Sequence, residues 1–218
     1  VISGTTGEAP TLSKSEKLRL LAEVKEVVGR RGWVIAGTGS NDTNASREFT
    51  REVEKLGVDA CLLVVPYYNK PSQEGLFQHF KSIAESTNLP CILYNVPART
   101  VTNMSAETTI KLSQIGNIIG IKDATANLER GSELIRRLPR GFSVFSGDDA
   151  TGLALMLLGG RGVISVTANV APRLVHEMCA AALAGDVAKA REINDRLLPL
   201  HRNLFLEANP IPVKWAVQ

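Results

Sequence analysis

Short apolar runs alternate along the chain with longer amphipathic segments. Most of the runs are continuously apolar, which is typical of strands buried on both faces of a parallel sheet. The expected strands are 33–36, 60–65, 91–94, 118–122, 142–145 and 162–166, with Val1–Ser3 as the tail of another. The segments between them predict helices near 43–56, 72–87, 105–113, 127–138, 150–158, 171–184 and 186–205.

A further helix is predicted to begin after Ser13. In the run Ser13-Lys14-Ser15-Glu16, the serine and the glutamate have the spacing of a capping box, which satisfies free N–H groups at a helix start. An apolar stripe follows, made of Leu18, Leu20, Leu21, Val24 and Val27.

The repeated order of strand then helix indicates a parallel α/β fold, and two such folds compete. A doubly wound nucleotide-binding sheet calls for a glycine-rich turn, but the only candidate, Gly37-Thr38-Gly39, lacks the third glycine of that motif. A (β/α)8 TIM barrel suits the strands better, although it needs eight of them in about 250 residues. We therefore expect one structural unit that lacks the first strand, most of the second and the C-terminal end. Residues 1–170 form the incomplete barrel, and 171–218 form an incomplete extension of extra C-terminal helices.

Composition narrows the class of protein. Apolar residues make up 44% of the chain and charged residues 22%, as in an ordinary globular protein. The net charge of +3 is not concentrated in a basic run, which argues against nucleic-acid binding. No apolar stretch is long enough to span a bilayer, and no signal peptide is visible. Cys61, Cys91 and Cys179 are odd in number and lie in apolar runs, a pattern of reduced thiols in a cytosolic protein rather than disulfides or a zinc site.

Candidate chemistry lies at the expected strand ends, where barrels carry their active sites. Lys122 follows Ile118–Ile121 at the rim of an apolar strand. Burial lowers the pKa of a lysine, and the neutral amine attacks a ketone or aldehyde to give a Schiff base. The alternative is a strand-end lysine whose ammonium group reaches solvent.

Two other segments carry candidate groups. Gly4-Thr5-Thr6-Gly7-Glu8 offers hydroxyl and N–H groups that could hold a carboxylate, or it is a plain turn. The phenol of Tyr94 could move a proton and Arg99 could bind a carboxylate, or the two are a packed tyrosine and a surface arginine. Asp148 and Asp149 are interpreted as helix N-caps rather than as a catalytic pair. His79, His176 and His201 fall in helical segments and are interpreted as structural or solvated; no Ser-His-Asp or metal-ligand spacing emerges.

Eight ordered strings together resemble the dihydrodipicolinate synthase and N-acetylneuraminate lyase superfamily, over essentially the whole chain. They are GTTGE at 4–8, AGTGSN at 36–41, PYYNKPSQEG at 66–75, YNVPART at 94–100, GIKDAT at 120–125, SGDD at 146–149, GVISVTAN at 162–169 and NPIPVKWA at 209–216. The resemblance implies a (β/α)8 barrel with extra C-terminal helices, and a homotetramer built as a dimer of dimers.

The resemblance also implies roles for single residues. Lys122 matches the Schiff-base lysine and Tyr94 the tyrosine of a proton relay, with Thr6 as the catalytic threonine. Tyr68 matches a tyrosine that a neighbouring subunit inserts to complete the relay. The implied substrate-binding positions are Thr5, Thr6, Arg99, Gly147 and Ile164.

Within the superfamily, Arg99 and the string GTTGE point to the synthases rather than the lyases. The implied reaction condenses pyruvate with L-aspartate 4-semialdehyde to give 4-hydroxy-tetrahydrodipicolinate, the first committed step of diaminopimelate and lysine biosynthesis. No metal or organic cofactor is implied, and the expected location is the cytoplasm. The alternatives are a related keto-acid aldolase or lyase of the N-acetylneuraminate lyase type, and an inactive fragment that only binds keto acids.

A regulatory site for L-lysine is expected to be non-functional. In responsive synthases this site lies between two subunits, away from the catalytic pocket. Asn41 and Tyr67 keep two of its positions. Lys14 and Lys17 stand where strongly inhibited relatives carry histidines, and Ala45 stands where they carry a glutamate. The alternative is that both lysines are solvated and that other groups hold the ligand.

Overall fold

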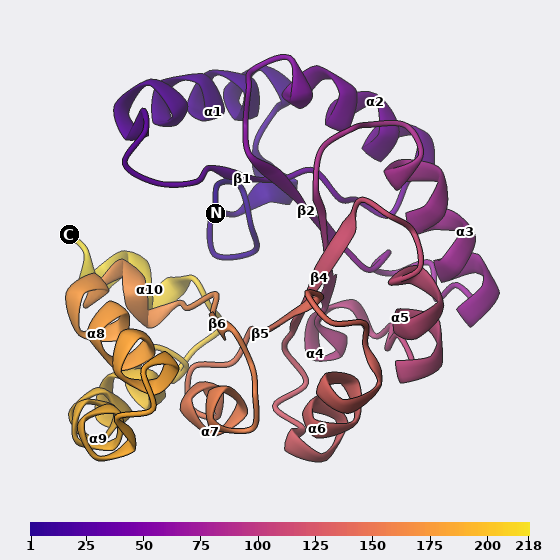
Figure 1. The fold of residues 1–218 in the computed structure, drawn as a ribbon. Coiled ribbons are helices and arrows are strands. Elements are labelled where there is room, and N and C mark those ends of the chain that lie inside the picture. The colour runs from indigo at the N-terminus through magenta and orange to yellow at the C-terminus, as the bar shows by residue number, and fades with distance from the viewer. The chain divides into compact units, whose positions relative to one another are not determined.

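The computed structural model describes all 218 residues, Val1–Gln218, as two compact units (Figure 1). The first contains Val1–Ile121 and Leu138–Phe142, and the second contains Lys122–Arg137 and Ser143–Gln218. The boundary falls inside strand β4 (Ile118–Asp123), which therefore begins in one unit and ends in the other. The expected division at residue 170 stays a prediction.

In the first unit, helices follow the strands in regular alternation. The elements are η1 (Ala9–Thr11), α1 (Lys14–Val28), β1 (Ile35–Gly37), α2 (Thr43–Glu54), β2 (Ala60–Val64), α3 (Gln73–Ala84), β3 (Cys91–Asn95), α4 (Pro97–Thr100), α5 (Ala106–Leu112) and the start of β4. Helices α1, α2 and α3 lie along the outer side of β1 and β2 (Figure 1). The capping box at α1 is confirmed, because Ser13 Oγ accepts from the N–H of Glu16 and the Glu16 side chain accepts from the N–H of Ser13.

The sheet is parallel, as the sequence predicts. Cys61 pairs with Cys91 between β2 and β3, and Ile35 pairs with Ala60 between β1 and β2. Strand β3 is buried throughout, which explains its unbroken apolar run. The six strands follow sequence order from β1 to β6. A doubly wound sheet would reverse its strand order at a switch point, so the order favours the barrel-type arrangement.

The two N-terminal strand predictions need correction. Residues Val1–Ser3 contribute only an isolated parallel bridge, between Ile2 and Ala36. The strand expected from Trp33 begins at Ile35, and the Trp33 side chain is 79% exposed. Gly37 is required by close backbone approach, since a Cβ there would lie 2.1 Å from the carbonyl oxygen of Ser3.

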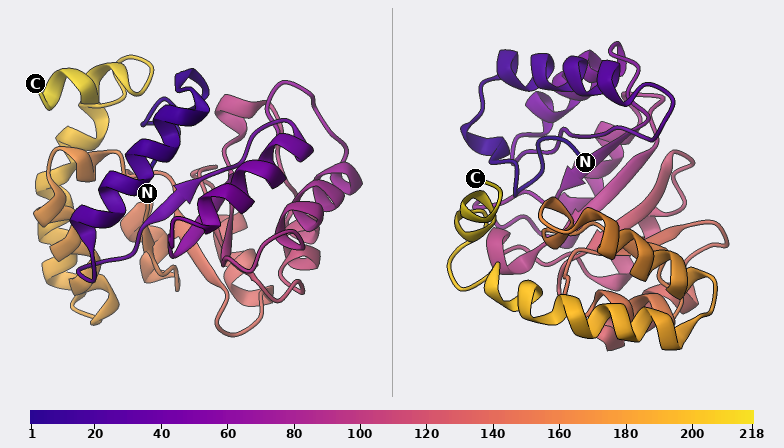
Figure 2. Two further views of the ribbon diagram at one scale, coloured as in Figure 1. Left: turned by 90° about the horizontal axis from the view of Figure 1, so that it is seen from above. Right: turned by 90° about the vertical axis from the view of Figure 1, so that its left-hand side faces the viewer.

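The second unit contains the end of β4, then α6 (Leu128–Arg137), β5 (Ser143–Ser146), α7 (Gly152–Leu157), β6 (Gly162–Val163), η2 (Thr167–Asn169), α8 (Pro172–Leu183), α9 (Val187–Asn203) and α10 (Ile211–Ala216). Helices α8 and α9 lie side by side in both views (Figures 1 and 2). Their shared core includes Val175, Met178, Ile193 and Leu197. At about 1.5–3 kcal/mol for each large apolar side chain buried, this core is the main stabilising contact of the two helices.

Strand β6 is shorter than the expected 162–166 and ends at Val163. The N–H groups of Val166 and Thr167 bond to the carboxylate of Asp149 instead of to a strand, which ends the sheet pairing. No helix in the structure is long and apolar enough to cross a membrane.

Candidate active site

A cavity of about 510 Å³ opens in the first unit. Thr5 comes from the loop before α1, Tyr94 from β3 and Arg99 from α4, and all three line it. Lys14 and Lys17 of α1, Ala45 of α2, and Tyr67 line the same cavity. The sequence led us to expect the lysine-site positions away from the catalytic pocket, but in this unit one cavity holds members of both sets.

Tyr94 and Thr5 form the hydroxyl pair of this cavity. Thr5 Oγ1 lies 3.4 Å from Tyr94 Oη, at the long end for a hydrogen bond between hydroxyls. Such contacts often lengthen in the absence of substrate and tighten when it binds. Tyr94 is 5% exposed, and this burial raises the pKa of its phenol, against the opposing effects of the Thr5 hydrogen bond and the Arg99 charge. The contact expected between Thr6 and Tyr94 stays a prediction.

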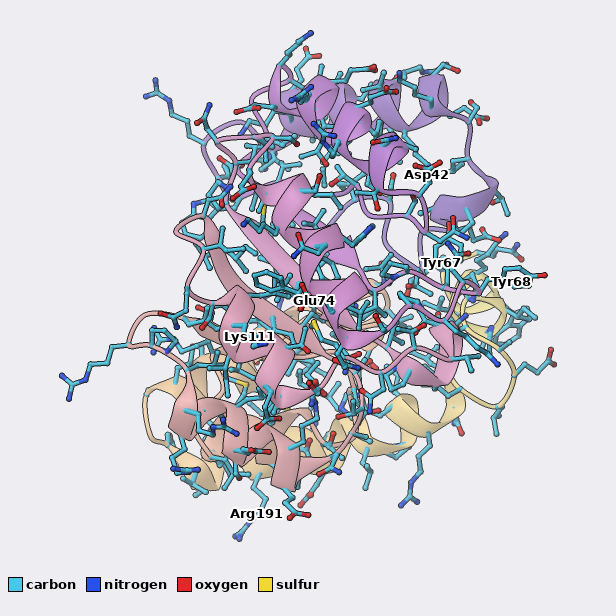
Figure 3. All side chains as sticks on the ribbon, turned by 90° about the vertical axis from the view of Figure 1, so that its right-hand side faces the viewer. Asp42, Tyr67, Tyr68, Glu74, Lys111 and Arg191 are labelled. Carbon is cyan, nitrogen blue, oxygen red and sulfur yellow. The ribbon has the colours of Figure 1, made fainter.

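Tyr67 and Tyr68, both labelled in Figure 3, lie in the loop that follows β2. Tyr67 lines the cavity, whereas Tyr68 does not. Tyr68 adopts a positive φ of 72° and is 88% exposed. A side chain turned to solvent by a left-handed backbone is available to another molecule, which the expected insertion into a neighbouring subunit requires. That insertion itself stays a prediction.

The two lysines of α1 are held by α2. The ammonium group of Lys14 forms an ion pair with the carboxylate of Glu52. The ammonium group of Lys17 lies 5.7 Å from the centroid of the Phe49 ring, within the range of a cation–π contact. Burial lowers the pKa of Lys17. Both lysines thus make a contact within their own chain, while Lys14 stays exposed to solvent.

Asn41 precedes the N-cap of α2 in the chain and does not line the cavity. Its side-chain amide donates to Asn69 Oδ1 at 3.3 Å, and the Asn69 amide donates to the Asn41 carbonyl at 2.8 Å. This pairing fixes the loop before α2 against the loop that carries Tyr67.

Lys122 lies in the second unit, in the last part of β4. Burial lowers the pKa of its ammonium group to about 8, and the carboxylate of Asp149 opposes that shift. Near neutral pH an appreciable fraction of the side chain is thus a neutral amine, the nucleophilic form. This meets the expectation from its position at an apolar strand end.

Gly147 and Ile164 lie in the same unit as Lys122. A Cβ at Gly147 would stand 2.9 Å from Lys122 Cε and 2.7 Å from Ala124 Cβ, so the absence of a side chain there leaves room for the lysine. The N–H of Ile164 donates to the carbonyl of Ser146 at 2.8 Å, which places Ile164 beside the end of β5.

Sequence reasoning missed a buried polar network in this unit. Asp149 does not cap a helix, because its Oδ2 accepts from the backbone N–H groups of Val166 and Thr167. Thr167 Oγ1 in turn lies 2.8 Å from His201 Nδ1 on α9. Asp148 accepts from the N–H of Thr151 at 2.8 Å, but the N-cap of α7 is Thr151, so Asp148 does not cap the helix either. Two adjacent aspartates in SGDD carry no signal that separates these roles.

The two buried histidines confirm the structural interpretation. His201 is 3% exposed and bonded to Thr167, and burial lowers its pKa. His79 Nδ1 lies 2.8 Å from Thr43 Oγ1, and burial lowers its pKa to about 4. A buried ion pair that the sequence did not reveal joins Asp123 and Arg130 at 2.8 Å, beside Lys122 in the chain.

Comparisons with known proteins point to one family over the whole length of the chain. Residues 1–218 match the sequence model of the dihydrodipicolinate synthetase family. A 4-hydroxy-tetrahydrodipicolinate synthase of Nitrosomonas eutropha is 60% identical over 217 residues, which cover 100% of this chain and 74% of that protein.

Solved structures are similarly close. The chloride-inhibited dihydrodipicolinate synthase of Acinetobacter baumannii, complexed with pyruvate, is 52% identical with a TM-score of 0.97, over 99% of this chain and 74% of that one. The enzyme of Cyanidioschyzon merolae with lysine bound is 44% identical with a TM-score of 0.96, over 99% and 74% of the two chains. This chain thus spans about three quarters of the length of these relatives.

Proposed function

The chain belongs to the dihydrodipicolinate synthetase family, and on that basis we propose that it condenses pyruvate with L-aspartate 4-semialdehyde to give 4-hydroxy-tetrahydrodipicolinate. This is a lyase reaction of the class I aldolase type, in diaminopimelate and lysine biosynthesis. The observation that carries the proposal is the lowered pKa of the Lys122 amine, about 8, in a chain that matches the family's sequence model over residues 1–218.

Lys122 begins the reaction as a nucleophile. Its neutral amine adds to the C2 carbonyl carbon of pyruvate to form a carbinolamine. Protonation of the carbinolamine hydroxyl and loss of water then leave an imine between Nζ and C2. Loss of a C3 proton gives an enamine, whose carbon attacks the aldehyde of the second substrate. The amino group of the second substrate finally attacks C2, which closes the ring of 4-hydroxy-tetrahydrodipicolinate and releases the lysine amine.

The relay hydroxyls move protons during these steps. The phenol of Tyr94 gives and takes up protons beside C2 of pyruvate. Thr5 is the hydroxyl group that exchanges protons with it, as the 3.4 Å contact between the two oxygens supports. Tyr68 completes the relay from a neighbouring subunit of a homotetramer, a role supported by its exposure. Thr6 shares with Thr5 the binding of the pyruvate carboxylate, and Gly147 and Ile164 offer backbone groups to the keto acid.

Arg99 selects the second substrate. A guanidinium group binds a carboxylate through two parallel charge-assisted hydrogen bonds, and the semialdehyde carries such a carboxylate at its amino-acid end. Arg99 lies at the exposed rim of the cavity that Tyr94 lines, which suits a group that meets the substrate arriving second.

The enclosing fold that we propose is a (β/α)8 barrel with extra C-terminal helices, to which this chain contributes six parallel strands. The enzyme acts in the cytoplasm. L-Lysine inhibits it weakly or not at all, because the Lys14 and Lys17 ammonium groups repel a cationic ligand and Ala45 offers it no carboxylate.

Substrate comparison tests this function. The purified protein is assayed for condensation of pyruvate with L-aspartate 4-semialdehyde and for cleavage of N-acetylneuraminate. The expected result is a kcat/KM about ten- to a hundredfold greater for the condensation, which corresponds to the roughly 1.5–3 kcal/mol that a charged hydrogen bond to Arg99 supplies. Faster cleavage of N-acetylneuraminate would assign the chain to the lyases, and no reaction with either would leave a keto-acid-binding fragment.

A further inference from the structure

Asp149 lies in the second unit, in the turn that follows β5. It is 4% exposed, and its Oδ2 accepts from the N–H of Val166 at 2.9 Å and of Thr167 at 3.0 Å. Its other oxygen, Oδ1, is buried and has no hydrogen-bond partner. A buried carboxylate oxygen without a donor is costly, so its presence calls for a physical reason.

The side chain of Lys122 lies against this same turn. Gly147, two residues before Asp149, donates its N–H to the carbonyl of Asp123 at 2.7 Å and so ties the turn to the end of β4. The Cε of Lys122 stands 2.9 Å from the point where a Cβ of Gly147 would be. The Asp149 carboxylate also acts electrostatically on the Lys122 ammonium group.

We propose that Asp149 is a positioning residue whose fixed negative charge stabilises the positive charge on the Lys122 nitrogen, first in the ammonium and then in the protonated imine. The inference rests on the proposed function, and it adds a residue that the family resemblance did not assign. Burial alone would favour an uncharged nitrogen at both stages. A carboxylate already held by two N–H groups stabilises the cation without reorganising as the imine forms.

The other titratable groups near Lys122 and Asp149 are paired elsewhere or uncharged. Asp123 pairs with Arg130 of α6 at 2.8 Å, and Asp148 accepts from the hydroxyl and N–H of Thr151. On α8, burial raises the pKa of Cys179, so that its thiol is uncharged at neutral pH. On α9, burial lowers the pKa of His201, which favours the neutral ring. Asp149 is thus the carboxylate of this group that keeps a buried oxygen free of donors.

Helix α9 supports the position of Asp149. The Nδ1 atom of His201 lies 2.8 Å from Thr167 Oγ1, and the N–H of Thr167 bonds to Asp149. Helix α9 is therefore connected to Asp149 through a short buried chain of hydrogen bonds. This gives α9 a part in the electrostatics of the site, in addition to its packing against α8.

The test removes the negative charge of Asp149 and keeps the shape of its side chain. Asp149→Asn retains a carbonyl oxygen that accepts from Val166 and Thr167. Asp148→Asn makes the same change one residue earlier and is the matched control. In each protein, competitive labelling with acetic anhydride across pH, read by mass spectrometry, gives the titration midpoint of Lys122 without any substrate. We expect the midpoint to fall below that of the parent in Asp149→Asn and to stay at the parent value in Asp148→Asn.

Pyruvate then reports on the imine. Borohydride trapping against pyruvate concentration should show weaker imine formation in Asp149→Asn by about tenfold or more, because a neighbouring opposite charge typically stabilises a charged form by about 1–3 pKa units. If Asp149 had only a structural role, Asp149→Asn would lower the stability of the protein and leave the titration midpoint of Lys122 unchanged.

Coincident midpoints in parent and Asp149→Asn, or equal shifts in both variants, would overturn the inference. If Asp149→Asn does not fold, the smaller neutral variant Asp149→Ser takes its place under the same expectation. If the parent labels normally but traps no pyruvate on Lys122, it is the proposed function that fails, and the labelling midpoints still decide the role of Asp149.

Discussion

Replacing Gly147 by alanine tests the close contact between the turn after β5 and Lys122. The added Cβ would stand 2.7 Å from Ala124 Cβ and 2.9 Å from Lys122 Cε. Carbon atoms in contact prefer about 3.5–4.0 Å, so one or both neighbours must move by about 1 Å. The lysine is the more flexible of the two and will yield first. Overpacking of this kind costs about 1–3 kcal/mol of stability, and a displacement of about 1 Å at a reacting atom costs about a hundredfold in rate.

The assay measures both effects in the same protein. We expect Gly147→Ala to lower the free energy of unfolding in denaturant by about 1–3 kcal/mol and to slow borohydride trapping of pyruvate by at least tenfold. The matched control is Gly116→Ala, since a Cβ at Gly116 would meet nothing within 4 Å. This control should stay within about 0.5 kcal/mol of the parent and trap pyruvate at the parent rate. Parent-like trapping by Gly147→Ala would refute the contact.

The remaining predictions concern substrates, the relay, regulation and acid stability. Arg99→Ala should raise the KM for the semialdehyde about ten- to a hundredfold and leave the KM for pyruvate unchanged; equal damage to both would indicate a structural role. Tyr68→Phe should reduce kcat more than it weakens pyruvate binding, and the reverse pattern would contradict a relay role. Half-inhibition by L-lysine below about 1 mM in a dose–response curve would show that the altered regulatory site still works. Because the pKa of His79 is about 4 in the fold against 6.5 normally, the unfolded chain binds the proton first. The free energy of unfolding should therefore fall between pH 6.5 and 4, by up to about 3 kcal/mol, and less in His79→Gln.

Most helices and the central strands could be predicted because they depend on residues close together in the sequence. Strands β2 and β3 are continuous apolar runs, and such runs have few options other than a buried parallel strand. Helix α1 begins where its capping box places it. The predicted helices from α2 to α9 agree with the observed ones within a few residues, apart from α4, whose four residues are too few to show a helical period.

The features that could not be predicted from the sequence depend on contacts between residues far apart in the chain. Strand β6 stops early because Asp149 captures the N–H groups of Val166 and Thr167, and no local pattern encodes a contact across 17 residues. Likewise, Asp148 and Asp149 are equivalent by propensity and differ only in what the fold brings to them. The lowered pKa of Lys122 was predictable because a lysine at the end of a buried strand loses the hydration that favours its charged form.

One measurement tests the Schiff-base function most directly. The protein is incubated with pyruvate and sodium borohydride, digested, and analysed by mass spectrometry. We predict one reduced pyruvate adduct per chain, located on Lys122 and absent from Lys122→Ala. With the pKa of Lys122 at about 8, the yield before saturation should rise as the pH increases toward that value. An adduct on a different lysine, or no adduct in the parent protein, would contradict the assignment of Lys122 as the catalytic nucleophile.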